Sequence, residues 1–190
     1  MLGEVKDENR FEFTEISEDY MRKRILELPR KASCGDDDIA YIDIIAGERY
    51  TVKLLTEITN MILVTRHWPR SWKNSILKPL YKGIGDRWKA GNYRPVALTS
   101  AISRLVERIV NEQLVTFIME SDLNLEENHG FVKGRGCATA VLEILQELSE
   151  CVEDGGIPTM LGIDISAAFD CLNRRKLIRQ LSHMGWELTP

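Results

Sequence analysis

The sequence has few cysteines and no long hydrophobic run. No stretch reaches the roughly 18 apolar residues of a membrane span, and the charged start MLGEVKDENR lacks the apolar core of a signal peptide. We therefore expect an intracellular protein without a membrane segment, in either nucleus or cytoplasm. The absence of any C-x-x-C pair argues against a zinc site and a disulfide framework. The four cysteines are Cys34, Cys137, Cys151 and Cys171.

The net charge of −4 is unusual for a nucleic-acid-binding protein, but the charges are unevenly distributed. Residues 66–94 contain eight Lys or Arg and one acidic residue, whereas acids outnumber bases on both sides. Cations beside aromatic rings suit contact with phosphates and stacking on bases or sugars. On composition alone, a solvated loop whose aromatics fill a core is an equal alternative. The interleaved aromatics are Trp68, Trp72, Tyr81, Trp88 and Tyr93.

Hydrophobic spacing predicts the order of helices and strands. A first helix follows Ser17 as its N-cap and ends before Pro29, and a second helix ends before Trp68. The segment SILKPLYK carries a proline, which predicts an edge strand in a hairpin, and a glycine-rich turn follows it. Two longer helices over 102–117 and 138–152 have apolar stripes that we expect to face the core.

The C-terminal part of the sequence predicts a buried strand and a helix. The run IPTMLGIDI, residues 157–165, is short and mostly apolar, which favours a strand inside a sheet. A last helix begins near Asn173 and directs Leu177, Leu181 and Met184 inward. Helices, an edge hairpin, a buried strand and a final helix together predict an α+β fold.

The clearest candidate for chemistry is Asp164, in the segment LGIDISAAFD. A carboxylate at the end of an apolar strand needs a cation, hydrogen-bond donors or solvent. Mg²⁺ prefers oxygen ligands and is typically held by one or two carboxylates together with substrate phosphates. A lone strand-end aspartate more often caps the next turn, so Asp164 by itself does not establish a metal site.

Five sequence blocks follow one another through most of the chain: KASCGDDDI, WPRSWKNSILKPLYKGIGD, NYRPVALTSAISRLVERIV, NHGFVKGRGCATAV and GIDISAAFD. In order, they resemble K-x-S-P-G-P-D-G-I, W-P-x-x-W-K, N-Y-R-P-I, G-F-R-x-G-R-S-T and D-x-x-x-A-F-D of the reverse transcriptases of non-LTR retrotransposons. One such block is weak evidence, whereas five in matching order are strong.

The resemblance implies the fingers and palm of a right-hand polymerase, truncated before the palm is complete. It divides the chain into a helical N-terminal part of the fingers (1–60), fingers with a nucleotide- and template-contacting basic segment (61–157), and the start of the palm (158–190). An aromatic-x-Asp-Asp turn with further catalytic carboxylates, and a thumb, would follow in the family. We therefore expect no polymerisation by this chain alone, and its status as an enzyme stays open.

The resemblance also implies roles for single residues. Asp164 would be the catalytic ligand of two Mg²⁺ ions, and the backbone carbonyl of Ile165 would help to hold one of them. Phe169 would be a rigid gate that leaves no room for a ribose 2′-hydroxyl. Lys82 and Arg94 would bind the triphosphate of the incoming nucleotide, Arg bidentately and Lys as a point charge.

Other motif residues have implied roles on the template side or in the local fold. Lys133, Gly134 and Arg135 resemble the template-strand contact, where glycine lets two backbones approach. His129 stands where the family commonly has Gln, and we predict a local hydrogen-bonding role for it. We predict that Asp170 caps the following helix.

The chain also departs from the family pattern. Cys34 and Asp38 replace Pro and Gly of the first block, and Val132 replaces an Arg that would contact template or nucleotide. Gly136 and Cys137 replace Ser and Thr, which removes hydroxyls that could cap a helix.

The leading hypothesis is a fragment of an RNA-directed DNA polymerase, a nucleotidyltransferase of a transposable element. Its partners would be an RNA template, a DNA primer, deoxynucleoside triphosphates and the remainder of the polymerase polypeptide, without a membrane. The alternative is a decayed or domesticated remnant that binds nucleic acid weakly through 66–94 and 133–135. An unrelated α+β interaction domain is disfavoured by the ordered blocks.

Overall fold

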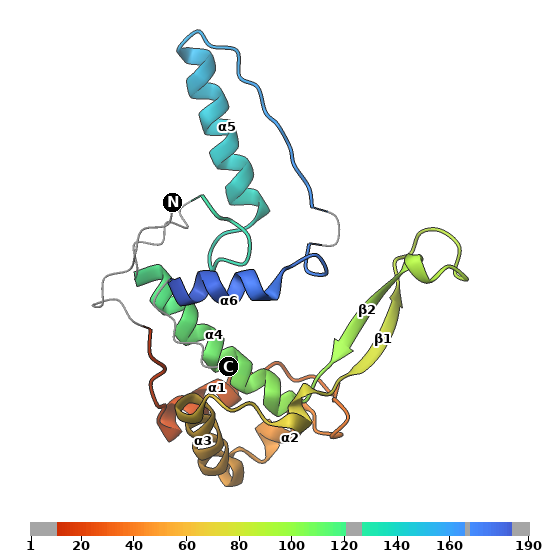
Figure 1. Ribbon diagram of the computed structural model, residues 1–190, viewed down its shortest axis with the longest axis vertical. Helices are drawn as coiled ribbons and strands as arrows, with labels where there is room; N and C mark the ends of the chain where they lie inside the picture. Colours follow the sequence, from red (N-terminus) through yellow and green to blue (C-terminus); the bar gives the residue numbers. More distant parts are fainter. Residues whose placement is uncertain (1–10, 121–126, 166–167, 184–190) are drawn as a thin grey trace. The chain divides into compact units, whose positions relative to one another are not determined.

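The computed structural model describes residues 11–120, 127–165 and 168–183, which contain helices and a two-stranded antiparallel sheet (Figure 1). This mixture is compatible with the predicted α+β class. Residues 11–117 form one unit, here called the N-terminal unit, and the described residues from Ile118 onward form the C-terminal unit. None of the described helices is both long and apolar enough to cross a membrane.

Helix α1 (Glu18–Leu26) begins where the sequence predicts it. The Ser17 side chain accepts a hydrogen bond from the backbone N–H of Tyr20 at 3.2 Å, which satisfies one of the free donors at the helix start. Met21 and Ile25, one turn apart, are completely buried. The predicted N-cap of this helix is therefore confirmed.

Two helices follow the loop that connects them to α1. Helix α3 (Glu48–Thr65) is the predicted second helix, and it ends where Arg66 adopts a left-handed conformation with φ 56°. The short helix α2 (Tyr41–Ala46) was not predicted, because six residues are too few for a clear hydrophobic period. Its Asp43 carboxylate accepts the N–H of Ala40 at 2.8 Å.

The core of the N-terminal unit lies where α1, α2, α3 and the first half of α4 (Ala101–Glu120) meet. The predicted stripe of α4 is buried at Leu105 and Ile109, and its later members Leu114 and Phe117 are half-buried. Each fully buried aliphatic side chain stabilises the fold by about 1.5–3 kcal/mol. The buried core residues are Met21, Ile25, Leu28, Ile44, Val52, Leu55, Ala101, Leu105 and Ile109.

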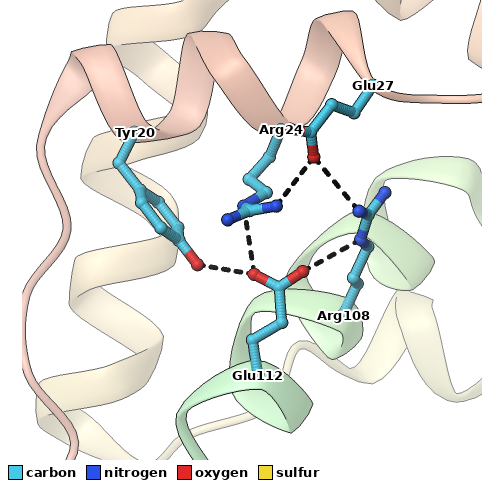
Figure 2. Close-up of polar contacts among 5 residues, drawn as sticks. All are labelled: Tyr20, Arg24, Glu27, Arg108 and Glu112. Atoms are coloured by element: carbon cyan, nitrogen blue, oxygen red, sulfur yellow. Dashed lines mark hydrogen bonds and ion pairs between the residues drawn. The ribbon is translucent and has the colours of Figure 1, made fainter. Parts of the chain in front are cut away.

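A polar network joins α1 to α4 beside this core, and Figure 2 shows its five side chains. The Glu112 carboxylate accepts the hydroxyl of Tyr20 at 2.6 Å and pairs with Arg24 Nε at 3.0 Å and Arg108 Nε at 3.1 Å. Glu27 pairs with the same two arginines, at 2.7 Å and 3.2 Å. Alternating charges on the two helices thus hold α4 in register with α1.

The loop 31–39 packs directly against the residues that precede α4. A Cβ atom added to Gly35 would lie 2.8 Å from the backbone nitrogen of Ser100, so this backbone approach requires glycine. Asp38 has φ 55°, a conformation that favours glycine, which the family pattern has at this position. Strand β2 (Tyr93–Leu98) leads into α4 through Ser100, so the loop fixes the base of the hairpin (Figure 1).

The C-terminal unit contains α5 (Cys137–Glu153) and α6 (Arg174–His183). The helix predicted over 138–152 is confirmed as α5, but its apolar stripe is not buried against other described residues, so the predicted core face is wrong here. Burial requires a second apolar surface, which periodicity within one helix does not supply. The exposed members include Val141, Leu145 and Val152.

Residues 157–165 were predicted to form a buried strand, and this prediction is wrong for the described structure. The segment has no regular secondary structure, and its apolar side chains are exposed. A buried strand exists only where neighbouring strands satisfy its backbone hydrogen bonds, and no described segment pairs with this one.

Helix α6 begins near Asn173, as predicted. The Asn173 side chain accepts the backbone N–H of Lys176 at 3.1 Å, so Asn173 caps the helix and the prediction that Asp170 does so is wrong. Leu177 and Leu181 are only partly covered, and Met184, the third residue predicted to point inward, lies outside the described residues.

Candidate nucleic-acid interface

The basic segment 66–94 includes most of an antiparallel hairpin. Strand β1 (Ile76–Tyr81) pairs with β2 in a register that places Leu80 opposite Arg94, and the Lys82 N–H extends the ladder to the carbonyl of Asn92 at 2.8 Å. Side chains alternate between faces along a strand, so Lys78, Leu80 and Lys82 share one face. Arg94 lies opposite Leu80 and therefore belongs to the same face. The structure thus places the predicted triphosphate contacts Lys82 and Arg94 on one surface, here called the cationic face.

In the part of the chain that the structure describes, the cations of this face have no acidic partner. Lys78, Lys82 and Arg94 are exposed, and within the part of the chain that the structure describes, none forms an ion pair with a carboxylate. The Lys82 ammonium donates a hydrogen bond to the carbonyl of Gly91 at 2.6 Å, which positions it without neutralising it. Sequence reasoning did not single out Lys78, although the alternation of residues along SILKPLYK could have identified it.

Two prolines protect the edges of the hairpin. Pro79 lies opposite Pro95. Hydrogen-bonded and non-hydrogen-bonded residue pairs alternate along an antiparallel ladder, and Lys82 with Asn92 is a hydrogen-bonded pair. By this alternation, the pair of prolines is a non-hydrogen-bonded one. The missing N–H groups would otherwise face outward, where another strand could pair with them. Proline at this site on both strands disfavours further sheet addition, so the hairpin offers its side-chain faces to a ligand.

The five aromatic residues of the basic segment divide into two groups. Four are half-buried and contact one another: the rings of Trp68 and Trp72 lie 5.6 Å apart, and those of Tyr81 and Tyr93 lie 5.5 Å apart. The fifth, Trp88, is 95% exposed. Four of the rings are therefore partly covered by packing in pairs but do not belong to the buried core, whereas Trp88 is available to a ligand.

The predicted template contacts lie in the loop before α5. Lys133, Gly134 and Arg135 are all exposed, and Gly134 has φ 82°, a conformation that strongly favours glycine. The Arg135 guanidinium donates to the carbonyl of Asn128 at 3.2 Å, and the Arg135 N–H donates to the carbonyl of Val132 at 3.1 Å. The loop is thereby closed on itself at its basic end.

His129 holds this loop against α5, which confirms its predicted hydrogen-bonding role. Its Nδ1 lies 2.8 Å from the Thr139 hydroxyl, and its Nε2 bonds to the Glu143 carboxylate. Thr139 also accepts the N–H of Gly136 at 2.9 Å, so it supplies a hydroxyl at the helix start although Gly136 and Cys137 replace Ser and Thr.

Asp164, the predicted metal ligand, lies in the irregular segment 157–165. Its side chain is exposed and has no hydrogen bond or ion pair within the described residues, so its carboxylate oxygens are free to bind a cation. An exposed carboxylate suits Mg²⁺ in chemical type. The described residues contain no group of three or more possible metal ligands, so they do not form a complete metal site around Asp164.

The neighbours of Asp164 have the same open environment. Ile165 is exposed, and Phe169, the predicted gate, is 83% exposed. Ser166 and Ala167 of the same motif lie outside the described residues. The C-terminal unit contains Asp164, Ile165, Phe169 and the loop before α5, whereas the N-terminal unit contains the cationic face.

No protein-family model matches the chain. Over 146 residues, 77% of its length, the chain is 26% identical to a probable RNA-directed DNA polymerase from transposon BS of Drosophila melanogaster. Over 160 residues, 84% of its length, it is 24% identical to a probable RNA-directed DNA polymerase from transposon X-element of the same organism. Over 155 residues, 82% of its length, it is 21% identical to the RNA-directed DNA polymerase from mobile element jockey, also of Drosophila melanogaster.

The matched regions cover 16%, 17% and 17% of these three relatives, so the chain spans about one sixth of their length. The three matches confirm the resemblance to non-LTR retrotransposon polymerases that the five sequence blocks indicated.

Proposed function

We propose that this chain, whose relatives are RNA-directed DNA polymerases of mobile elements, is the fingers and the start of the palm of such a polymerase. The complete enzyme would add deoxynucleotides to a DNA primer on an RNA template. The observation that carries the proposal is the cationic face of the β1–β2 hairpin, where Lys78, Lys82 and Arg94 have no acidic partner in the described structure. Such a face suits a polyanion.

The triphosphate of a deoxynucleotide is the polyanion that we assign to Lys82 and Arg94. A guanidinium can donate two parallel hydrogen bonds to one phosphate, and an ammonium adds a point charge beside it. The hydrogen bond from Lys82 to Gly91 holds the ammonium at the turn end of the hairpin. The proline pair at the hairpin edges supports binding through this face rather than through added strands.

The RNA template is assigned to the loop of the C-terminal unit. Lys133 and Arg135 would bind phosphates of the strand, and Gly134 would let its backbone approach. The bonds from Arg135 and His129 to the surrounding backbone and to α5 support this role, because they order the loop before a strand binds.

Asp164 is proposed as one of the carboxylates that hold two Mg²⁺ ions, together with the backbone carbonyl of Ile165. Bound Mg²⁺ would polarise the phosphate and stabilise the charge of the leaving group. Phe169 would exclude ribonucleotides by occupying the space of a 2′-hydroxyl. One aspartate is too few ligands for two ions, so the remaining carboxylates must come from outside the described residues. With Asp164 as the only metal-binding carboxylate that we assign, we expect no primer extension by the 190-residue chain alone.

Triphosphate binding by the full chain tests the proposal. Titration with a fluorescent deoxynucleoside triphosphate should show that Arg94→Ala weakens binding about 10- to 100-fold, because a hydrogen bond to a charged group is worth about 1.5–3 kcal/mol. Lys53→Ala, which removes an exposed cation from α3, is the matched control and should change little. Equal affinities of both variants and the wild type would contradict the proposal.

A second measurement separates the proposal from the alternative of a binding-only remnant. If Arg94→Ala does not change triphosphate affinity but the chain binds single-stranded RNA in a salt-dependent way, only nucleic-acid binding remains. Template-dependent extension that Asp164→Asn abolishes would support the polymerase assignment and refute the expected inactivity.

A further inference from the structure

The turn of the hairpin, residues 82–92, is fixed by side chains that bond to its backbone. The Tyr81 hydroxyl donates to the carbonyl of Gly85, and the Tyr93 hydroxyl donates to the carbonyl of Arg87 at 2.9 Å. The Asn92 amide donates to the carbonyl of Asp86 at 2.7 Å. Three side chains at the ends of the two strands thus hold three consecutive carbonyl groups in the turn, which makes it a preorganised structure.

Two further features fix the same turn. Gly85 has φ 87°, and a Cβ atom there would lie 2.7 Å from the Asn92 side-chain nitrogen, so glycine allows this packing. The single acidic residue of the basic segment, Asp86, accepts the N–H of Trp88 at 3.0 Å with its carboxylate. The only carboxylate of the turn is therefore used within the turn itself.

This ordered turn displays an apolar ring to solvent. Trp88 is 95% exposed, and Ile84 in the same turn is also exposed. Trp and Tyr usually contribute by burying a large ring surface, and the other four aromatics of the basic segment do so in part. A turn held rigid while its Trp is uncovered is the arrangement expected of a binding site that needs little reorganisation.

The charges around Trp88 indicate which ligand fits. Arg87 and Lys89 flank it in the sequence, the Arg87 guanidinium lies 5.2 Å from the centre of the Tyr81 ring, and neither cation has a carboxylate partner within the described residues. A flat ring between cations matches an unpaired base between phosphates. A duplex does not fit, because its bases are stacked inside.

We infer that Trp88 stacks on an unpaired base of single-stranded nucleic acid, while Arg87 and Lys89 bind the adjacent phosphates. The identification of that strand as the RNA template rests on the proposed function, whereas the stacking site itself rests on the geometry of the turn. Neither the sequence blocks nor the comparisons assign a role to Trp88.

The inference is tested by binding of the full chain to a fluorescent single-stranded RNA of about 12 nucleotides. Trp88→Ala should weaken binding about 5- to 100-fold, as loss of one stacked base predicts, and Trp88→Phe should retain most of the affinity. Wild-type protein should show a similar loss on the same strand made abasic, and Trp88→Ala should not alter binding to the corresponding duplex. Tyr50→Ala on α3 is the matched control, because that ring is 80% exposed outside the basic segment.

Three results would overturn the inference. The first is that Trp88→Ala binds single-stranded RNA as tightly as the wild type. The second is that Trp88→Ala loses as much affinity for the duplex as for single-stranded RNA. The third is that the wild type binds the abasic strand as tightly as the intact one. Unchanged RNA binding by Trp88→Ala, with triphosphate binding lost in Arg94→Ala, would leave the proposed function standing alone. Loss of RNA binding in Trp88→Ala, with no effect of Arg94→Ala on triphosphate, would leave the stacking site standing alone.

Discussion

Replacing Glu112 by Gln removes the central negative charge of the network between α1 and α4 while preserving its shape. The carboxylate binds Tyr20, Arg24 and Arg108, and Figure 2 shows all three converging on it. Glutamine can accept one of these hydrogen bonds, but it cannot balance two guanidinium groups. The substitution therefore weakens the contact that holds the two helices in register.

The size of the effect follows from the partial burial of the network. The side chains of Glu112, Arg24 and Arg108 are 29%, 19% and 38% exposed, which lies between a surface pair and a buried pair. Surface pairs contribute about 0.2–1 kcal/mol, and hydrogen bonds to charged groups contribute about 1.5–3 kcal/mol. Because the contacts share one carboxylate, they do not add up independently. We expect Glu112→Gln to lower the free energy of unfolding by about 1–2 kcal/mol.

Urea unfolding followed by far-ultraviolet circular dichroism measures this loss. Glu57→Gln on α3 is the matched control, since Glu57 is exposed and makes no hydrogen bond or ion pair in the described structure; it should change stability by less than about 0.5 kcal/mol. A double variant with Tyr20→Phe should show a coupling of at least about 0.5 kcal/mol with Glu112→Gln. Equal stability of Glu112→Gln and Glu57→Gln would refute the reasoning.

Three further predictions concern single residues. Burial, and secondarily the hydrogen bond to Glu112, raise the pKa of Tyr20 above its ordinary value near 10. The stability that this shift contributes is present below the ordinary pKa and is lost as the pH rises through the raised pKa. Urea titrations at several pH values should therefore show that Tyr20→Phe loses less unfolding free energy at alkaline pH than the wild type. Gly35→Ala forces Cβ against the backbone of the segment before α4 and should lower stability by about 1–3 kcal/mol, whereas Gly91→Ala, which meets nothing within 4 Å, should be neutral or slightly stabilising. His129→Ala releases the loop before α5 and should speed its cleavage by trypsin several-fold. An unchanged cleavage rate in His129→Ala would show that the tether does not order the loop.

The longer helices were predictable because their signals are local. Ser17 before two acidic residues predicts the start of α1, and the spacing of apolar residues predicts α3, α4 and α5. The hairpin was predictable for the same reason, because Pro79 marks an edge strand and the glycine-rich run marks a turn. The conformation of residues 157–165 was not predictable from their apolar composition, since a strand depends on partners elsewhere in the chain.

The candidate site shows the same division. The resemblance of the sequence blocks to a polymerase family identifies Lys82, Arg94, Lys133 and Asp164 as candidates, and the fold places the first two on one face of the hairpin. The exposure of Trp88 could not be read from its sequence neighbourhood, because four other aromatics of the same segment are half-buried. Whether an aromatic ring fills a gap or faces solvent depends on what packs against it.

By itself, the sequence determined the longer helices, where the hairpin lies and which polymerase relatives the chain resembles, because these depend on residue types at short, regular spacings. Only the tertiary structure decided that Gly35 must lie against the backbone before α4, that Glu112 joins α1 to α4, and that the hairpin turn is locked with Trp88 uncovered. These features arise from contacts between residues far apart in the chain or across a strand register, and local patterns do not encode such contacts.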